Sequence, residues 1–236
     1  MTAPAPTQTQ PQTQTQEPTP VAPLPSITVQ AERLVELGVP RIAGMTPAAF
    51  RAAATDLAAR VGDDRDPAED LLLVVHPTVA PASALAPLLR LGDKPGFVVV
   101  DMADVDRFAP VEGVTLPDGP LYVVTAPARG DEMANWSPDE ALPAITGTGR
   151  TPLTLTEGIA WALQVPDVIE RNHCFMTIGS RLRKPTGRLD ARTPALWISN
   201  GTGRDGTENR GAPKVGWCWA GNRHTWLGFA SGAGRR

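Results

Sequence analysis

The residues best suited to chemistry gather in the last third of this chain of 236 residues. That region holds four of the six tryptophans, both cysteines and two of the three histidines, namely Trp197, Trp217, Trp219, Trp226, Cys174, Cys218, His173 and His224. The loops between them are basic and contain Arg181, Arg183, Lys184, Arg188, Arg192, Arg204, Arg210 and Lys214. Arginine beside exposed aromatic rings is a combination that stacks on planar groups and holds phosphates. We therefore predict a surface that binds a protein or an anionic ligand.

One short segment brings several of these residue types together. Gly221 and Asn222 tolerate the positive φ angles of a tight turn, so the sequence predicts a hairpin here. Beyond the turn, Arg223 and His224 would lie near Trp226, where a cation, an imidazole and an indole can meet one ligand. The alternative is a solvated turn whose arginine pairs with a nearby acid.

The tryptophans just before this turn raise a question of orientation. Alternate residues of a strand point to opposite faces, so Trp217 and Trp219 share one face and Cys218 takes the other. If the tryptophans are exposed, the thiol is in the core and inert. If they are buried, the thiol is exposed and can react. The sequence leaves both arrangements open.

Two histidines and two cysteines match the ligand types of a zinc site. The candidates are His173, Cys174, Cys218 and His224. Their spacing is poor, because the adjacent residues His173 and Cys174 point to opposite faces of a strand and no CxxC motif is present. We therefore expect two core thiols, two unrelated histidines and no metal. A Cys–His pair for nucleophilic catalysis is the other use of the same residues.

Acidic side chains follow two of the predicted strands. Asp131 and Glu132 come after the strand at 121–125, and Asp101 ends the strand before it. Strand ends are where α/β proteins place functional groups. An enzyme acting on a small molecule or a nucleotide, using these acids or His224, is therefore the alternative to a binding protein. Solvated loop acids are the commoner outcome for such residues.

A glycine-rich segment has the spacing GxGxxG at Gly201, Gly203 and Gly206. A dinucleotide-binding loop of this kind must lead directly into a helix. Here Gly211 and Pro213 follow, so no helix is expected. We predict a long, flexible surface loop and no cofactor.

The elements that must position these residues fall into two parts. The first part is predicted to contain helices at 29–37 and 47–61, strands at 71–75, 97–101 and 121–125, a crossover helix within 81–91, and helices capped by Ser137 and Thr154. The crossover helix makes one βαβ unit, which is expected to join parallel strands. From about residue 172 the pattern changes to short strands, at 174–178, 195–199, 215–220 and 225–230. The expected fold class is α+β or mixed α/β, with N-terminal helices and a short βαβ-containing sheet followed by an antiparallel β-rich C-terminal segment.

Composition divides the chain into a tail and one domain. Residues 1–26 are rich in Pro, Thr and Gln and offer almost nothing to bury, which predicts a disordered tail before a single globular domain at 27–234. The absence of a signal peptide and the low cysteine count indicate a cytoplasmic protein. No apolar run is long enough to span a membrane.

The net charge of −3 conceals an asymmetry. Residues 150–236 contain 13 Lys and Arg against 6 Asp and Glu, whereas residues 1–149 contain 9 against 19. The two parts can pack on each other, or the basic part can face an anionic partner. A pI near 5.6 makes nucleic-acid binding a weaker expectation without excluding it.

Five blocks of sequence resemble a family of actinobacterial proteins of unknown function. They are GDEMANWSPDEAL (130–142), TPLTLTEGIAWAL (151–163), NHCFMTIGSR (172–181), ALWISNG (195–201) and APKVGWCWAGNRHTWLGFAS (212–231). The resemblance covers about residues 28–234, implies an actinobacterial cytoplasmic protein and supplies no catalytic residues. The resulting hypothesis is a non-catalytic binding or regulatory protein with a site on its Trp- and Arg-bearing C-terminal part.

Overall fold

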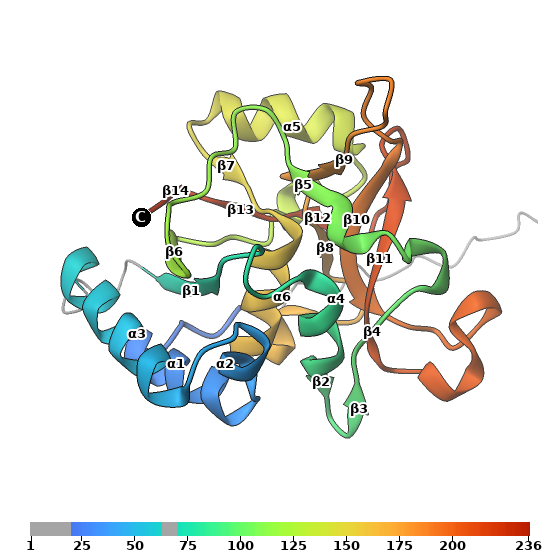
Figure 1. Ribbon diagram of the computed structural model, residues 1–236. Helices are drawn as coiled ribbons and strands as arrows, with labels where there is room; N and C mark the ends of the chain where they lie inside the picture. The colour runs from blue at the N-terminus through green and yellow to red at the C-terminus, as the bar shows by residue number, and fades with distance from the viewer. Residues whose placement is uncertain (1–19, 63–69) are drawn as a thin grey trace, which may run out of the picture.

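A computed structural model describes residues 20–62 and 70–236 (Figure 1). Most of the predicted tail, at 1–19, and the segment 63–69, where an acidic loop is expected between the helix at 47–61 and the strand at 71–75, lie outside the described residues. The fold class is α+β, with helices at the N-terminal end and a β-rich C-terminal part, as the sequence predicts. Residues 20–26 form neither helix nor strand, and Val21 and Leu24 pack against the core.

The three N-terminal helices are α1 (Ile27–Glu36), α2 (Val39–Ile42) and α3 (Pro47–Val61). Of these, α3 begins where the sequence predicts, α1 begins two residues earlier than predicted, and α2 was not predicted. The Thr46 hydroxyl accepts a hydrogen bond from the Ala49 amide, and Pro47 occupies the first helical position without losing a needed donor. The predicted bounds of α3 are confirmed because both signals are local.

The first sheet has three strands in the order β1-β6-β14, all paired antiparallel. The strands are β1 (Leu71–Val75), β6 (Leu121–Thr125) and β14 (Gly234–Arg235). The predicted βαβ unit is therefore wrong. The apolar runs that suggested buried parallel strands are buried because α1 and α3 contact one part of this sheet and α6 (Leu155–Gln164) contacts β1 as well. An antiparallel pair covered by helices has the same continuous apolar pattern.

The predicted crossover helix and the strand after it are also shorter than expected. Helix α4 (Ala82–Leu85) continues only into a 3₁₀ turn at Ala86–Leu88, which includes Pro87. Strand β4 (Phe97–Val98) does not reach Asp101, and it joins a different sheet from β1. A proline ring cannot continue the α-helical hydrogen-bond ladder, which explains the early end of α4.

Helix α6 lies at the centre of the molecule, between the first sheet and the second (Figure 1). All ten of its residues are buried, including the polar residues Thr156, Glu157 and Gln164. Its capping box is confirmed, with Thr154 accepting from the Glu157 amide and Glu157 accepting from the Thr154 amide. A Cβ atom at Gly158 would lie 2.4 Å from Thr177 Cγ2, so glycine allows α6 to approach the second sheet closely.

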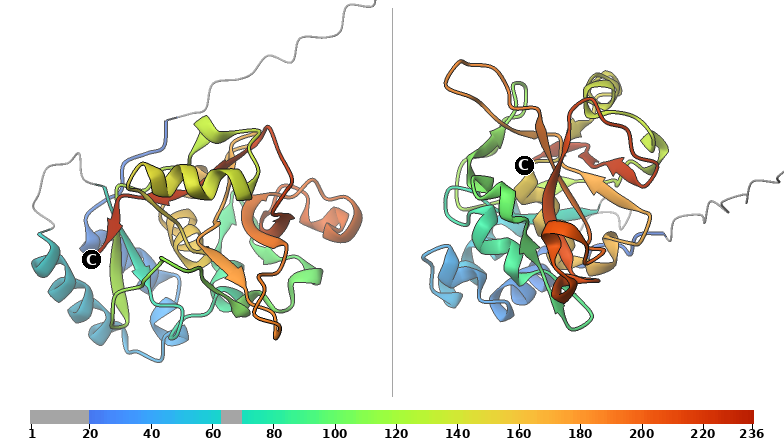
Figure 2. Two further views of the ribbon diagram at one scale, coloured as in Figure 1. Left: turned by 90° about the horizontal axis from the view of Figure 1, so that it is seen from above. Right: turned by 90° about the vertical axis from the view of Figure 1, so that its right-hand side faces the viewer.

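The second sheet has five strands in the order β12-β8-β10-β11-β4. The strands are β8 (Cys174–Met176), β10 (Arg192–Ile198), β11 (Pro213–Trp219), β12 (Leu227–Phe229) and the short β4. The central strands β8, β10 and β11 pair antiparallel, whereas β12 and β4 add parallel strands at the two edges. In Figure 2, β10 and β11 form a long and strongly twisted antiparallel pair.

The predicted hairpin at Gly221 and Asn222 is wrong. Strands β10 and β8 lie between β11 and β12, so the intervening residues form a crossing connection. Neither Gly221 nor Asn222 has a positive φ angle, which a type I′ turn requires at both positions. The Asn135 amide donates to the His224 carbonyl oxygen and holds the connection in place.

The remaining elements are short and connect these layers. They are α5 (Pro138–Gly147), β2 (Arg90–Leu91), β3 (Lys94–Pro95), β5 (Phe108–Pro110), β7 (Thr151–Pro152), β9 (Ser180–Leu182) and β13 (Ser231–Gly232). Among the described residues, no helix combines the length and the hydrophobicity that crossing a membrane requires.

Gln30 on α1 satisfies the open edge of β1, and its replacement tests this packing. Its amide nitrogen donates to the carbonyl oxygen of Leu71 at 2.6 Å, and its side-chain oxygen accepts from the Leu73 amide at 2.8 Å. Gln30→Leu should lower the free energy of unfolding by about 1–3 kcal/mol for each buried group left unpaired. Urea denaturation measures the change. Glu36→Leu, on the exposed side of α1, should change it by less than about 0.5 kcal/mol, and equal losses would contradict this role.

Candidate functional site

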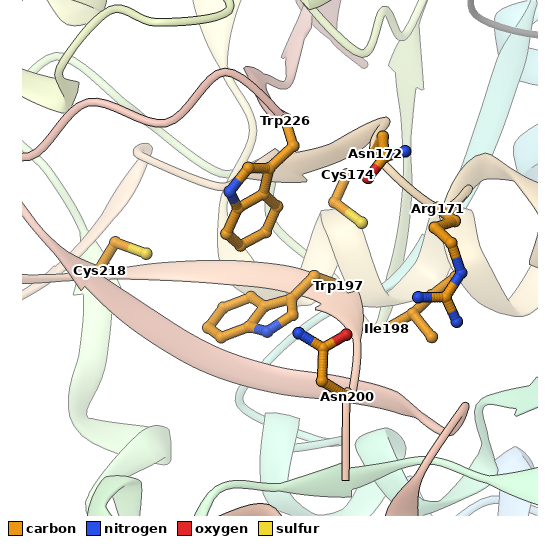
Figure 3. Close-up of a pocket in the computed structure, with 8 residues that line it drawn as sticks. All are labelled: Arg171, Asn172, Cys174, Trp197, Ile198, Asn200, Cys218 and Trp226. Carbon is orange, nitrogen blue, oxygen red and sulfur yellow. The ribbon is translucent and has the colours of Figure 1, made fainter. Parts of the chain in front are cut away.

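A cavity of about 310 Å³ opens on the C-terminal sheet (Figure 3). It is lined by Arg171, Asn172, Cys174, Trp197, Ile198, Asn200, Cys218 and Trp226. These residues come from β8, β10 and β11 and from the segments next to β8, β10 and β12. The cavity, named the tryptophan cavity below, therefore depends on the tertiary arrangement of the whole sheet.

Two indole rings form its walls. The rings of Trp197 and Trp226 meet edge to face, with centroids 6.1 Å apart and an interplanar angle of 68°. In Figure 3 the Trp226 ring lies directly above the Trp197 ring. A Cβ atom at Gly216 would lie 2.7 Å from Trp197 Cη2, so glycine leaves room for this indole over β11. The arrangement gives an apolar, aromatic interior.

Polar groups surround this interior. The side chain of Arg171 is exposed, and its guanidinium has no hydrogen-bond or ion-pair partner among the described residues. Asn172 adopts a left-handed backbone with φ of 70°, which asparagine tolerates better than most residues. Asn200 lies on the opposite side of the pocket from Trp226 in Figure 3. One cation and two amides are thus available to a ligand inside the cavity.

Lys214, which lies opposite Trp197 on the neighbouring strand β11, places its ammonium over the Trp197 ring. Its ammonium lies 4.5 Å from the ring centroid, and it also contacts Asp205 Oδ2 at 2.5 Å. Asp205 additionally accepts a hydrogen bond from the Ser199 hydroxyl at 2.8 Å. This network ties the glycine-rich loop to β10 and β11. The loop predicted to be flexible is therefore anchored, with two 3₁₀ turns inside it.

Both cysteines line the tryptophan cavity as free thiols. Burial raises the pKa of the Cys174 thiol to about 12 and that of Cys218 to about 11. The Cys174 thiol also donates to the Glu170 carbonyl oxygen. Both sulfurs are consequently protonated at neutral pH, where thiols are poor nucleophiles.

Alkylation kinetics check this protonation state. At pH 7.5, iodoacetamide should modify both thiols much more slowly in the folded protein than in urea, because only the thiolate reacts. Cys218 should react faster than Cys174, since it is less buried and has the lower pKa. Mass spectrometry of the modified peptides separates the two rates. Modification at the denatured rate would contradict protonated, buried thiols.

Arg223 and His224, which the sequence placed in a hairpin, make contacts with different parts of the structure. Arg223 forms an ion pair with Glu140 and donates to the Asn135 carbonyl oxygen at 3.1 Å. The His224 ring lies 5.2 Å from that of Trp226, and its Nε2 atom is buried without a partner in the described part of the chain. Burial lowers the pKa of His224. His224 thus supports Trp226, whereas Arg223 is engaged elsewhere.

Trp217 and Trp219 share a face, as their alternation predicts. Their ring centroids are 4.5 Å apart, and Trp219 is 48 % exposed. Cys218 lies on the other face and reaches the tryptophan cavity. Neither alternative from the sequence holds fully, because Trp219 is exposed whereas Trp217 and the Cys218 thiol are both half-buried.

The other predicted site residues lie outside this cavity. Arg181 donates to the Asp190 carbonyl oxygen at 3.1 Å, and Arg183 donates to the Gly187 carbonyl oxygen at 2.8 Å. Asp131 accepts from the Arg129 Nε atom at 2.8 Å, and Glu132 is exposed. These contacts occupy Arg181, Arg183 and Asp131 in local structure.

The four residues considered as candidate zinc ligands do not form a cluster. Within residues 20–62 and 70–236, no group of three or more His, Cys, Asp and Glu side chains is placed to hold a metal ion. His173 pairs through its backbone with Glu170, while Cys174 faces the tryptophan cavity. Adjacent residues on a strand point to opposite faces, which is consistent with this separation.

Sequence reasoning missed several residues of the cavity. Arg171, Asn172 and Asn200 carry no motif, and Trp197 was recognised only as one of four tryptophans in the region. The block NHCFMTIGSR, which resembles the family of unknown function, begins at Asn172 and was the sequence feature that came closest to indicating this part of the cavity. What places these residues together is the pairing of β8 with β10 and of β10 with β11.

Comparison with known proteins agrees with the resemblance seen in the sequence blocks. A family model described as a family of unknown function (DUF5701) matches residues 33–236. No curated protein and no solved structure matches the chain significantly. The match covers most of the chain, and the protein therefore belongs to this family of unknown function, DUF5701.

Proposed function

We propose that this protein is a cytoplasmic, non-catalytic binding protein whose tryptophan cavity holds a small aromatic anion. The observation that carries the proposal is the presence, in one cavity, of two indoles in edge-to-face contact and an arginine without a partner in the described structure. The indoles suit a flat apolar body, and the guanidinium suits a carboxylate or a phosphate.

The size of the cavity sets the size of the ligand. Ligand pockets commonly span roughly 300–1,000 Å³ and are mostly apolar with a few placed polar groups. At about 310 Å³, the tryptophan cavity suits a ligand of one or two fused rings. Asn172 and Asn200 supply amide donors and acceptors that can orient the polar end of such a ligand.

The chemistry of the lining favours binding over catalysis. The thiols of Cys174 and Cys218 are protonated at neutral pH, so neither is poised as a nucleophile. The acids considered for an enzyme, Asp131 and Glu132, do not line the cavity. The observations therefore support a receptor for a small molecule better than the enzyme alternative.

Calorimetric titration with a matched pair of ligands tests the proposal. The aromatic carboxylate 2-naphthoate should bind, and the uncharged 2-naphthamide should bind about tenfold more weakly, which corresponds to ~1.4 kcal/mol. Arg171→Gln should weaken 2-naphthoate by a similar factor and leave 2-naphthamide unchanged, because only the charge-assisted contact is lost.

The control for this titration is Arg188→Gln, which alters another exposed arginine outside the cavity lining. It should leave both affinities unchanged. Equal weakening by Arg188→Gln and Arg171→Gln would indicate a general charge effect. Failure of 2-naphthoate to bind the wild-type protein would contradict the proposed ligand class.

A further inference from the structure

A second cavity, of about 560 Å³, adjoins the tryptophan cavity. The two cavities share Arg171 and Ile198 in their walls. In Figure 3 these two side chains lie together at one end of the tryptophan cavity. A ligand that fills the tryptophan cavity can therefore extend past Arg171 into further space. The second cavity is named the side cavity below.

Most of the wall of the side cavity is apolar. Its apolar residues come from the start of the described chain, from β2, from the segment after the 3₁₀ turn at Pro166–Val168 and from the end of β10. They are Pro20, Val21, Ala22, Leu91, Ile169 and Ile198. The first of these segments is held in place, because Val21 packs against the core and the Leu24 amide donates to Asp70 Oδ1 at 3.2 Å. Such a wall favours an aliphatic group over water.

The charged groups of the side cavity restrict where an anion can lie. The carboxylates of Asp167 and Glu170 line it together with the guanidinium of Arg171. Of the described residues that line the two cavities, only Arg171 is cationic. A ligand anion therefore finds a compensating charge at the boundary between the cavities, and the part of the ligand beyond that boundary must be uncharged.

We infer that the ligand is an aromatic carboxylate that also carries an uncharged aliphatic chain next to its carboxylate, and that this chain occupies the side cavity. The inference rests on the proposed function, since it assigns the aromatic ring to the tryptophan cavity and the carboxylate to Arg171. A ring, a carboxylate and a chain diverge from one carbon atom in an N-acyl aromatic amino acid. This shape matches two cavities that meet at one arginine.

Calorimetric titration with N-acetyl-L-phenylalanine and N-hexanoyl-L-phenylalanine tests the inference. The two compounds share the ring and the carboxylate, and the second is longer by four methylene groups. A methylene group that becomes fully buried strengthens binding about fourfold, which corresponds to ~0.8 kcal/mol. Partial burial of the chain should make the hexanoyl compound bind the wild-type protein at least about tenfold more tightly than the acetyl compound.

Two variants locate the chain. Leu91→Gln and Val21→Gln each place an amide in the wall of the side cavity at a half-buried position, on separate segments. Each should remove most of the gain from the hexanoyl chain. Neither should change the affinity for N-acetyl-L-phenylalanine, because neither residue lines the tryptophan cavity. Leu116→Gln, which alters a half-buried leucine outside both cavities, is the matched control and should change neither affinity.

The outcomes separate this inference from the proposed function. Equal affinity of the wild-type protein for the two compounds would overturn the inference and leave the proposed function intact. A gain that persists in both Leu91→Gln and Val21→Gln would also overturn it, because the chain would then lie outside the side cavity. Tight binding of hexanoate, without binding of N-acetyl-L-phenylalanine or 2-naphthoate, would contradict the proposed function itself and the inference with it.

Discussion

Arg235→Ala is expected to lower the free energy of unfolding by about 3–5 kcal/mol, because it leaves a buried carboxylate without its cation. Arg235 Nε lies 2.6 Å from Glu157 Oε1, and Nη2 lies 2.8 Å from Oε2. Glu157 is fully buried, and the hydroxyl of Tyr122 also donates to its Oε1 atom. The ion pair links β14 to the central helix α6.

Chemical denaturation of three variants checks this expectation. Arg188→Ala, which alters an exposed arginine, should change the free energy of unfolding by less than about 0.5 kcal/mol. Adding Glu157→Gln to Arg235→Ala should recover part of the loss, because the neutral amide oxygen still accepts hydrogen bonds without a buried charge. A loss below about 1 kcal/mol in Arg235→Ala would show that the pair contributes little.

Asp205→Ala is expected to cost about 3–5 kcal/mol as well, since it leaves the ammonium of Lys214 buried and unpaired. Both side chains are about one-tenth exposed. The same change removes the acceptor for the Ser199 hydroxyl and releases the loop that carries Asn200. Affinity for a ligand in the tryptophan cavity should therefore fall together with stability.

A double-mutant cycle isolates the interaction between Asp205 and Lys214. Lys214→Met removes the buried charge while keeping an unbranched chain near Trp197. Combined with Asp205→Ala, it should be clearly more stable than Asp205→Ala alone, because the pair is lost but no charge remains buried. Additive losses in the double variant would contradict direct coupling between the two side chains.

Local signals in the sequence correctly predicted where helices α3 and α6 begin. Thr46 with Pro47, and Thr154 with Glu157, define helix starts through hydrogen bonds within a few residues. Such signals act on their own neighbourhood, so the sequence is sufficient to read them. The alternation of Trp217 and Trp219 was predictable for the same reason.

Strand pairing was harder to predict because it depends on distant residues. The apolar run at Leu71–Val75 is compatible with a parallel or an antiparallel neighbour. Helices that cover a strand require it to be apolar along its whole length, so this pattern does not reveal the orientation of the neighbouring strand. The turn-like pair Gly221 and Asn222 fitted a hairpin, yet two other strands separate β11 from β12. Propensity is local, whereas partner choice is not.

In the candidate site, too, local features were predictable from the sequence, whereas the contacts between distant residues were not. Its tryptophans and cysteines were recognisable as unusual residues, but the sequence offered no means of choosing Trp197 and Trp226 over Trp217 and Trp219. That choice follows from the register of β10 on β11, which places Trp197 opposite Lys214. Arg171 became a candidate only when its guanidinium was found at the cavity.

The indole N–H resonances of the six tryptophans provide the most direct test of ligand binding in the tryptophan cavity. Each signal can be assigned with single Trp→Phe variants in a two-dimensional nitrogen–proton NMR spectrum. On titration with 2-naphthoate, the signals of Trp197 and Trp226 should shift, whereas that of the buried Trp161 should stay in place. Shifts confined to Trp217 and Trp219, or no shift at saturating ligand, would contradict the proposed site.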